Sequence, residues 1–227
     1  MSESDKSRIA VYSTYCGTRD NRTMRRGKVS RRTPHFFISN NADALKQAHK
    51  SGWTPIRLDV EESADPVVSA TQAKLAKAKP EVFEELADFE FLFYIDDKKA
   101  VNCSRIPGFI DAMTATGAAL ALRRHPFLPP NVLHEFSEAM SHQRYRIQRL
   151  QTGEYISREL ASGYRAECDT LFWTSAILRN MRHPRILELN DLWYDHITRC
   201  GIECQISFHF VAQRFQREVM LLPDTIE

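Results

Sequence analysis

In the middle of the chain lies the stretch Phe89-Glu90-Phe91-Leu92-Phe93-Tyr94-Ile95-Asp96-Asp97-Lys98. Five large apolar or aromatic residues run together over 91–95, and two carboxylates follow them without an intervening turn residue. A run of this length, rich in Phe, Tyr and Ile, predicts a buried strand in a sheet that is covered on both faces.

Asp96 and Asp97 follow this strand at its carboxyl end, where open α/β sheets bind their ligands. Carboxylate oxygens at such an edge suit a divalent cation that carries a diphosphate, with coordination positions left for phosphate and water. The alternative is that both residues begin a solvated loop or cap the next helix, because Asp after a strand is common turn chemistry.

Strands and helices alternate on both sides of this stretch. The expected strands are 8–15, 35–39, 53–60, 89–95, 118–123 and 171–178, and the expected helices are 43–51, 67–87 with a split at Pro80, 106–116, 132–152, 155–162, 186–199 and 205–215. This alternation predicts an α/β fold with a mainly parallel central sheet flanked by helices. Since no linker, repeat or low-complexity tract interrupts the chain, we expect one domain over 1–227, with a core from about 8 to 215 and tails at 1–7 and 216–227.

The composition is that of a globular protein with a real core, since 43% of the 227 residues are hydrophobic and 26% are charged. No apolar run approaches the roughly 20 residues needed to span a bilayer. The polar start of the chain, residues 1–8, indicates neither a signal peptide nor an anchor. Five scattered cysteines without a Cys-x-x-Cys pair predict reduced thiols in a cytoplasmic protein and argue against a zinc site.

The formal charge of +2 provides no global basic field for nucleic acid. Basic side chains nevertheless crowd into residues 19–32, namely Arg19, Arg22, Arg25, Arg26, Lys28, Arg31 and Arg32. Such a segment suits a phosphate-rich partner, and the alternative is a solvated loop. A nucleic-acid-binding module built on this segment is the least favoured function, because no known nucleic-acid motif accompanies it.

A series of short motifs extends over most of the chain, from about residue 8 to 215. They are Tyr12 to Asp20, Phe37-Ile38-Ser39, Trp53, Tyr94-Ile95-Asp96, His125-Pro126, Glu135 and Glu138 with Ala139, Gly163, Ile177-Leu178-Arg179, Trp193, and Gln205-Ile206-Ser207-Phe208. In order and spacing they resemble the glycosyltransferase-like domain family of plant mucilage and turgor-related proteins and bacterial polysaccharide loci. The resemblance implies a GT-A-like fold. It also implies an enzyme that moves a sugar from a nucleotide-diphosphate donor to a glycan or other hydroxyl acceptor.

On the donor side, the resemblance implies that Asp96, with Asp97, holds a divalent cation (Mn or Mg) against the donor diphosphate. Arg19 and Asp20 would lie near the nucleotide. Lys98 stands where many GT-A enzymes have the second carboxylate of an Asp-x-Asp motif. Its ammonium can stabilise the diphosphate directly, which leaves metal-independent transfer open.

On the sugar and acceptor side, the resemblance implies roles for His125, Glu203 and Gln205. Arg123, beside His125 at the end of its strand, is expected to bind the donor. The family's acidic residue before the glutamine is Cys204 here, and Glu203 precedes it by one position. This departure supports the second function we consider, a catalytically silent domain that only binds a nucleotide sugar or a glycan.

Glu135 and Glu138 lie three residues apart and share a helix face. They can receive protons from acceptor hydroxyls or form ion pairs with Arg123 and Arg124, and we expect the ion pairs.

Overall fold

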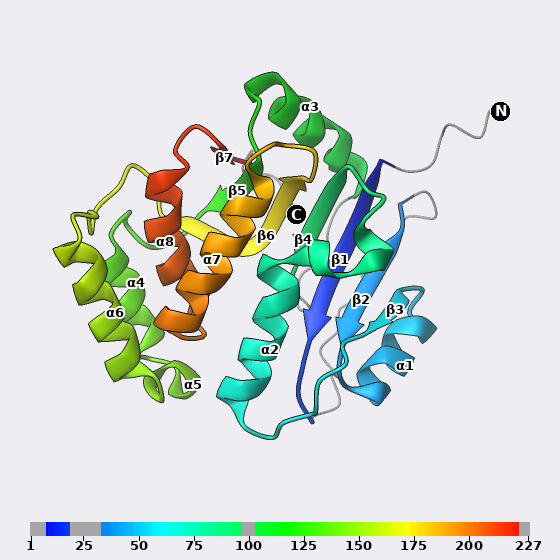
Figure 1. Ribbon diagram of the computed structural model, residues 1–227, viewed down its shortest axis with the longest axis horizontal. Coiled ribbons are helices and arrows are strands. Elements are labelled where there is room, and N and C mark those ends of the chain that lie inside the picture. The colour runs from blue at the N-terminus through cyan, green and yellow to red at the C-terminus, as the bar shows by residue number, and fades with distance from the viewer. Residues whose placement is uncertain (1–7, 19–32, 97–102, 223–227) are drawn as a thin grey trace.

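The computed structural model describes residues 8–18, 33–96 and 103–222 of the chain. Within these residues seven strands form one sheet in the order β3-β2-β1-β4-β6-β5-β7 (Figure 1). The strands are β1 (Ile9–Tyr15), β2 (His35–Ser39), β3 (Thr54–Arg57), β4 (Phe91–Ile95), β5 (Leu120–Arg124), β6 (Phe172–Asn180) and β7 (Val219–Leu221). Only β6 runs antiparallel to its neighbours, β4 and β5. The expected α/β fold with a mainly parallel sheet is confirmed.

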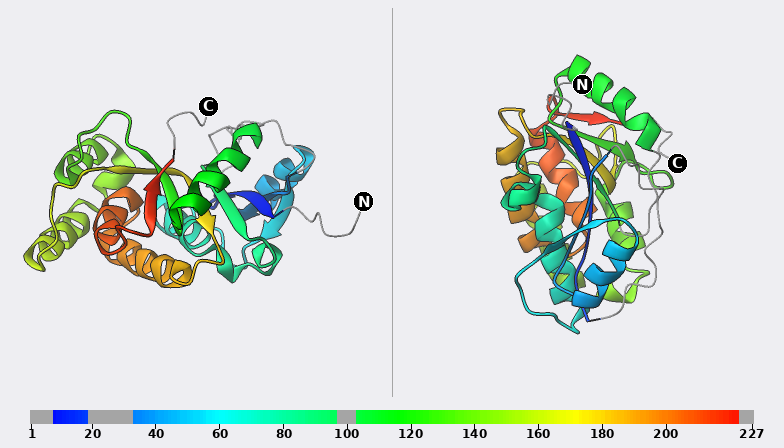
Figure 2. Two further views of the ribbon diagram at one scale, coloured as in Figure 1. Left: turned by 90° about the horizontal axis from the view of Figure 1, so that it is seen from above. Right: turned by 90° about the vertical axis from the view of Figure 1, so that its right-hand side faces the viewer.

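Helices cover both faces of this sheet, as the view from above in Figure 2 shows. The helices are α1 (Ala42–Lys50), α2 (Pro66–Ala78), α3 (Ile106–Thr116), α4 (Val132–Ala139), α5 (Gln143–Arg146), α6 (Arg149–Ala161), α7 (Ile186–Cys200) and α8 (Cys204–Arg214). α1 and α3 lie on one face, and α2, α7 and α8 lie on the other. α4, α5 and α6 form a flank beside α7 and α8 (Figure 1).

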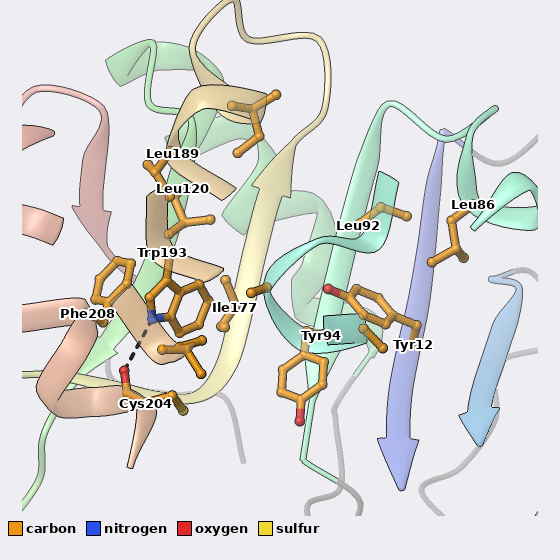
Figure 3. Packing of buried hydrophobic residues seen from close by; sticks show 14 of the residues in the cluster. Tyr12, Leu86, Leu92, Tyr94, Leu120, Ile177, Leu189, Trp193, Cys204 and Phe208 are labelled. Carbon is orange, nitrogen blue, oxygen red and sulfur yellow. Dashed lines mark hydrogen bonds between the residues drawn. The ribbon is translucent and has the colours of Figure 1, made fainter. Parts of the chain in front are cut away.

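The middle strand β4 needs the uninterrupted apolar run of residues 91–95, because both of its faces are buried. All five of its residues are buried, and successive side chains point to opposite faces of the sheet. Leu92 and Tyr94 pack in the cluster that contains Tyr12 and Trp193, beneath α2, α7 and α8 (Figure 3). Phe91, Phe93 and Ile95 pack on the opposite side with residues of α1 and α3.

Local sequence sets the ends of several helices. Asn41 caps α1 by accepting a hydrogen bond from the amide of Ala44 at 2.8 Å. Asp65 caps α2 in the same way, with Pro66 in the first helical position. Gly117 ends α3 at a φ of 67°, a left-handed conformation that glycine adopts without strain. Pro80 ends the α2 segment as expected, and short 3₁₀ turns replace the helix beyond it.

The single helix expected over 132–152 is wrong. His142 leaves the helical conformation, with φ −97° and ψ 125°, so the segment divides into α4, α5 and the start of α6. Tertiary contacts account for the break. Gln148 accepts a hydrogen bond from the amide of Ile202 at 2.9 Å, and Tyr145 bonds to Glu203. A straight helix of that length would extend about 30 Å and carry these side chains away from the α7–α8 turn.

The chain beyond residue 215, expected as a tail, returns to the sheet. β7 pairs in parallel with β5, and Leu222 after it is 2% exposed. The three-residue strand is too short to give a periodic signal in the sequence. Among the described residues, no helix combines the length and the apolar character that a membrane crossing requires.

Candidate active site

The functional candidates gather at one edge of the sheet, where β1, β2, β4 and β5 end and β6 begins. In Figure 1 this is the edge to which the arrowheads of β1 and β2 point. Asp96 follows β4 there, and His125 follows β5. Because β6 runs the other way, its first residues, including Trp173 and Thr174, lie at the same edge. The start of α8 also reaches it, through a contact of 3.3 Å between Cys204 Sγ and Thr174 Oγ1.

Asp96 is held in one orientation by its backbone and by two side chains. Its amide donates to the carbonyl of Ser175 at 2.9 Å. Its Oδ1 accepts from the Tyr94 hydroxyl at 2.8 Å and from Lys77 Nζ at 3.3 Å. The Lys77 side chain is 4% exposed, whereas that of Asp96 is 39% exposed. Asp96 is therefore a fixed carboxylate that a ligand can reach, with a buried ammonium beside it.

Lys74 brings a second ammonium to the same edge. Its Nζ donates to Cys204 Sγ at 3.1 Å. Burial alone would lower the pKa of Lys74, but the nearby Cys204, Glu203 and Asp96 outweigh burial and raise it above its ordinary value. Lys74 thus stays charged. Since Lys74 and Lys77 lie three residues apart on α2, both project from one face of that helix. A pair of positive charges at a sheet edge suits an anionic ligand.

A second cluster joins the start of α8 to α4. Gln205 Nε2 donates to Glu135 Oε1 at 2.6 Å, and the Thr174 amide donates to Gln205 Oε1 at 3.3 Å. These two bonds fix which end of the Gln205 amide faces Glu135. Glu203 caps α8, and its Oε1 accepts from the Gln205 amide at 3.2 Å. An anionic side chain at this position is favoured by the helix dipole.

Glu135 is the most perturbed carboxyl group of this cluster. It is 4% exposed, and its Oε2 has no hydrogen-bond partner among the described residues. Burial and the charge of Glu203 raise its pKa to about 7, although the hydrogen bond from Gln205 opposes the change. A carboxyl group that titrates near neutral pH can accept or release a proton in a reaction.

His125 faces the unpartnered oxygen of Glu135. Its Nδ1 accepts from the amides of Leu128 at 3.0 Å and Phe127 at 3.4 Å, so the proton of the neutral ring is on Nε2. That nitrogen lies 3.7 Å from Glu135 Oε2. Burial lowers the pKa of His125, which keeps the ring neutral near pH 7.

The structure brings together four of the residues singled out in the sequence, Asp96, His125, Glu203 and Gln205. Arg123 lies at the same edge, with its guanidinium 5.2 Å from the ring centroid of Trp173. The expected ion pairing of Glu135 with Arg123 and Arg124 is wrong, because the Glu135 carboxyl contacts Gln205 and His125 instead. The predictions for Arg19, Asp20, Asp97, Lys98 and the basic segment 19–32 lie outside the described residues.

Sequence reasoning missed Lys74, Lys77, Thr174 and Tyr145. The Tyr145 hydroxyl hydrogen-bonds to Glu203, and burial together with Glu203 raises its pKa far above the ordinary value, so it stays a donor. Lys74 and Lys77 within the apolar pattern of 67–87 were the available signal, because a charged residue on an inward helix face needs a partner.

Asp96 is the candidate cation ligand at this edge, because its carboxylate is 39% exposed. No group of three metal-ligating side chains forms in the described part of the chain. A magnesium-type cation nevertheless needs only one or two carboxylates when substrate phosphates complete its coordination. The exposed Asp96 carboxylate fits that limited requirement.

Comparisons with known proteins show the fold. No family model matches the sequence, and no curated protein matches it significantly. Mouse xyloside xylosyltransferase 1, in its apo form, matches with a TM-score of 0.54 and 13% identity over 94% of this chain and 84% of that one. Core-mannan synthase A of Aspergillus fumigatus, in its Mn/GDP form, matches with a TM-score of 0.51 and 10% identity, covering 98% of this chain and 74% of that one. The mannosyltransferase Ktr4p of S. cerevisiae matches with a TM-score of 0.50 and 7% identity, covering 96% of this chain and 69% of that one. The chain therefore has the GT-A-type fold of these glycosyltransferases.

Proposed function

We propose that this protein is a glycosyltransferase that moves a sugar from a nucleotide-diphosphate donor to a hydroxyl group of a glycan or other acceptor. The observation that carries the proposal is the placement of two different clusters at one sheet edge. The Asp96–Lys77 pair suits a diphosphate, and the Glu135–Gln205–Glu203 cluster suits proton transfer and charge stabilisation. The sequence resemblance supports a role in polysaccharide biosynthesis and kinship with the plant mucilage and bacterial polysaccharide-locus proteins.

The donor side must neutralise the negative charge that grows on the departing diphosphate. Lys74 and Lys77 are charged donors at the edge, and Asp96 fixes the ammonium of Lys77. A divalent cation held by Asp96, and by Asp97 outside the described residues, would neutralise diphosphate charge as a Lewis acid. The Mn/GDP form of core-mannan synthase A supports this assignment. Lys98 would add positive charge next to Asp97, and Arg19 and Asp20 would contact the donor.

The acceptor side needs a base for the acceptor hydroxyl. We assign this role to Glu135, because Oε2 has no hydrogen-bond partner in the described part of the chain and a pKa of about 7 is near the best value for a base at neutral pH. Gln205 holds the other oxygen of Glu135 in place. The Nε2–H of His125 would donate to a sugar or acceptor hydroxyl.

Glu203 supports the reacting sugar. Transfer passes through a state in which positive charge develops on the sugar ring. A carboxylate fixed at the start of α8 stabilises that charge, and Tyr145 and the Gln205 amide hold it in place.

A catalytically silent domain that binds the same donor is the second candidate. One observation favours it, because Cys204 occupies the position of the family's acidic residue and is only 2% exposed. Its thiol is engaged by Lys74 and Thr174.

A thermal-shift screen of nucleotide diphosphates and their sugars, with and without manganese, tests donor binding. At a concentration of 100 times Kd, a ligand stabilises the folded state by about 2.7 kcal/mol, or roughly 5–11 °C for a domain of this size. Asp96→Asn should lose most of this shift, because an amide keeps the shape and loses the charge. The matched control Asp111→Asn changes an exposed carboxylate on α3 and should keep it. If no diphosphate stabilises the wild type, or if Asp96→Asn responds like the wild type, the donor assignment is wrong.

A further inference from the structure

The loop between β5 and α4 presents an aromatic side chain to solvent next to the acceptor base. Phe127 is 87% exposed, more than any other large hydrophobic side chain in the described residues. A single exposed hydrophobic residue is ordinary on a protein surface. The surroundings of Phe127, rather than its exposure, therefore carry the inference.

The loop that carries Phe127 is fixed in place. The amides of Phe127 and Leu128 both donate to Nδ1 of His125, at 3.4 and 3.0 Å. Pro126, Pro129 and Pro130 restrict the backbone on both sides of the aromatic residue. After the loop, the Pro130 carbonyl accepts from the Cys168 amide at 3.1 Å. The ring thus stands on a preorganised turn, and little ordering is needed for a ligand to use it.

Phe127 begins a row of rings along the site. The ring centroids of Phe127 and His125 are 6.3 Å apart, and those of His125 and Trp173 are 6.2 Å apart. Both pairs of rings pack edge to face. The guanidinium of Arg123 covers Trp173. The same imidazole that receives the Phe127 loop on Nδ1 faces Glu135 Oε2 through Nε2. The His125 ring therefore lies between the exposed Phe127 ring and the proposed base, Glu135.

The sheet order separates Phe127 and His125 from the donor cluster. Asp96 follows β4, whereas Phe127 and His125 follow β5, and β6 lies between these two strands. The diphosphate and the Phe127 ring would thus sit on opposite sides of β6. The transferred sugar would lie between them, near Glu203 and Gln205.

We propose that Phe127 is the platform of an acceptor subsite, and that the acceptor is a carbohydrate whose terminal pyranose ring packs on the Phe127 ring. A pyranose has an apolar face of C–H groups and a polar rim of hydroxyls. It therefore matches an aromatic ring flanked by hydrogen-bonding groups. With its ring on Phe127, such an acceptor directs a rim hydroxyl toward His125 and Glu135. This inference rests on the proposed function and adds the chemical class of the acceptor.

The test uses binding of simple carbohydrates to the full chain. The probes are the methyl glycosides of glucose, mannose, galactose and xylose and short oligosaccharides of the same sugars, with binding followed by saturation-transfer NMR. The wild type should bind at least one of them, and Phe127→Ala should weaken that binding about tenfold or more. Phe127→Tyr, which keeps the ring, should stay within about threefold. Leu187→Ala is the matched control. Leu187 is 52% exposed at the start of α7, which follows the opposite end of β6.

Thermal shifts with UDP and GDP, measured on the same variants, separate this inference from the proposed function. Unchanged nucleotide shifts with lost carbohydrate binding in Phe127→Ala would support the subsite. Equal carbohydrate affinity in wild type and Phe127→Ala would overturn it, as would a wild type that binds nucleotides and none of the carbohydrates. Loss of both kinds of ligand in Phe127→Ala would also overturn a separate acceptor subsite. Carbohydrate binding that depends on Phe127, without any nucleotide binding, would support the subsite and contradict the donor side of the proposed function.

Discussion

Glu135→Gln should make the protein more stable at alkaline pH and leave it unchanged at acidic pH. The substitution keeps the shape of the side chain and keeps an oxygen that can accept the hydrogen bond from Gln205 Nε2. It removes the possibility of a negative charge at a position that is 4% exposed and lies near Glu203. The variant therefore isolates the free-energy cost of ionising Glu135 in the folded protein.

The size and sign of the effect follow from the pKa. In the unfolded chain Glu135 releases its proton near its ordinary value of 4.5, and in the folded chain it does so at about 7. Between these values the folded state binds more protons than the unfolded state, so stability falls as pH rises. The rise in the pKa of Glu135 from 4.5 to about 7 corresponds to about 3 kcal/mol of unfolding free energy lost when the group ionises. Glu135→Gln should therefore match the wild type near pH 4.5 and exceed it by about 2–3 kcal/mol at pH 8.

Urea unfolding at pH 4.5, 6, 7 and 8, followed by tryptophan fluorescence, measures this difference. Glu138→Gln is the control, because Glu138 is exposed on the same helix and removing its charge should give no comparable pH dependence. If the difference in unfolding free energy between Glu135→Gln and the wild type stays constant over this pH range, the raised pKa of Glu135 is refuted. The same conclusion holds if the variant is less stable than the wild type at pH 8.

Four further substitutions test other parts of the structure. Glu203→Gln should lower turnover by about 10²-fold or more with donor binding little changed, because in the proposed function its carboxylate acts mainly in the transition state. Steady-state kinetics and a donor titration would show this, and normal turnover would remove Glu203 from the proposed mechanism. Cys204→Ser should be nearly neutral in the same assay, and Cys204→Asp should not reduce activity. Arg179→Met should lower the free energy of unfolding by about 3–5 kcal/mol in urea titrations. The reason is that the buried Arg179 donates hydrogen bonds to the Tyr12 hydroxyl, the Lys77 carbonyl and Asn190. A loss below about 1 kcal/mol would contradict this.

The elements that carry a local pattern could be predicted from the sequence. The apolar run at 91–95 gave a fully buried central strand, because such a run has no polar face to present to water. The helix over 106–116 was predicted from Pro107 near its start and from its apolar residues, and its observed bounds agree. Asp96 was placed at the sheet edge by the same logic, since it follows a buried strand directly.

The contacts that complete the site join residues far apart in the chain. Glu135 and Gln205 are 70 positions apart, and Lys74 and Cys204 are 130 apart, so no local periodicity connects them. The break at His142 has the same origin, because it follows from contacts with the α7–α8 turn and not from proline or glycine. The pairing of Glu135 with arginine was wrong for this reason too: sequence proximity suggested a partner, and the packing of α8 against α4 supplied another.

The central claim is that the two clusters at the sheet edge together catalyse sugar transfer. Its most direct test measures the release of free nucleoside diphosphate from a panel of nucleotide-diphosphate sugars, with manganese present and carbohydrate acceptors added. The wild type should release diphosphate from at least one donor, faster with an acceptor present. Asp96→Asn should lose donor binding and release together, whereas Glu135→Gln should bind donor normally and lose the acceptor-dependent rate. Tight donor binding without any release, with or without acceptor, would contradict the account and identify a catalytically silent binding domain.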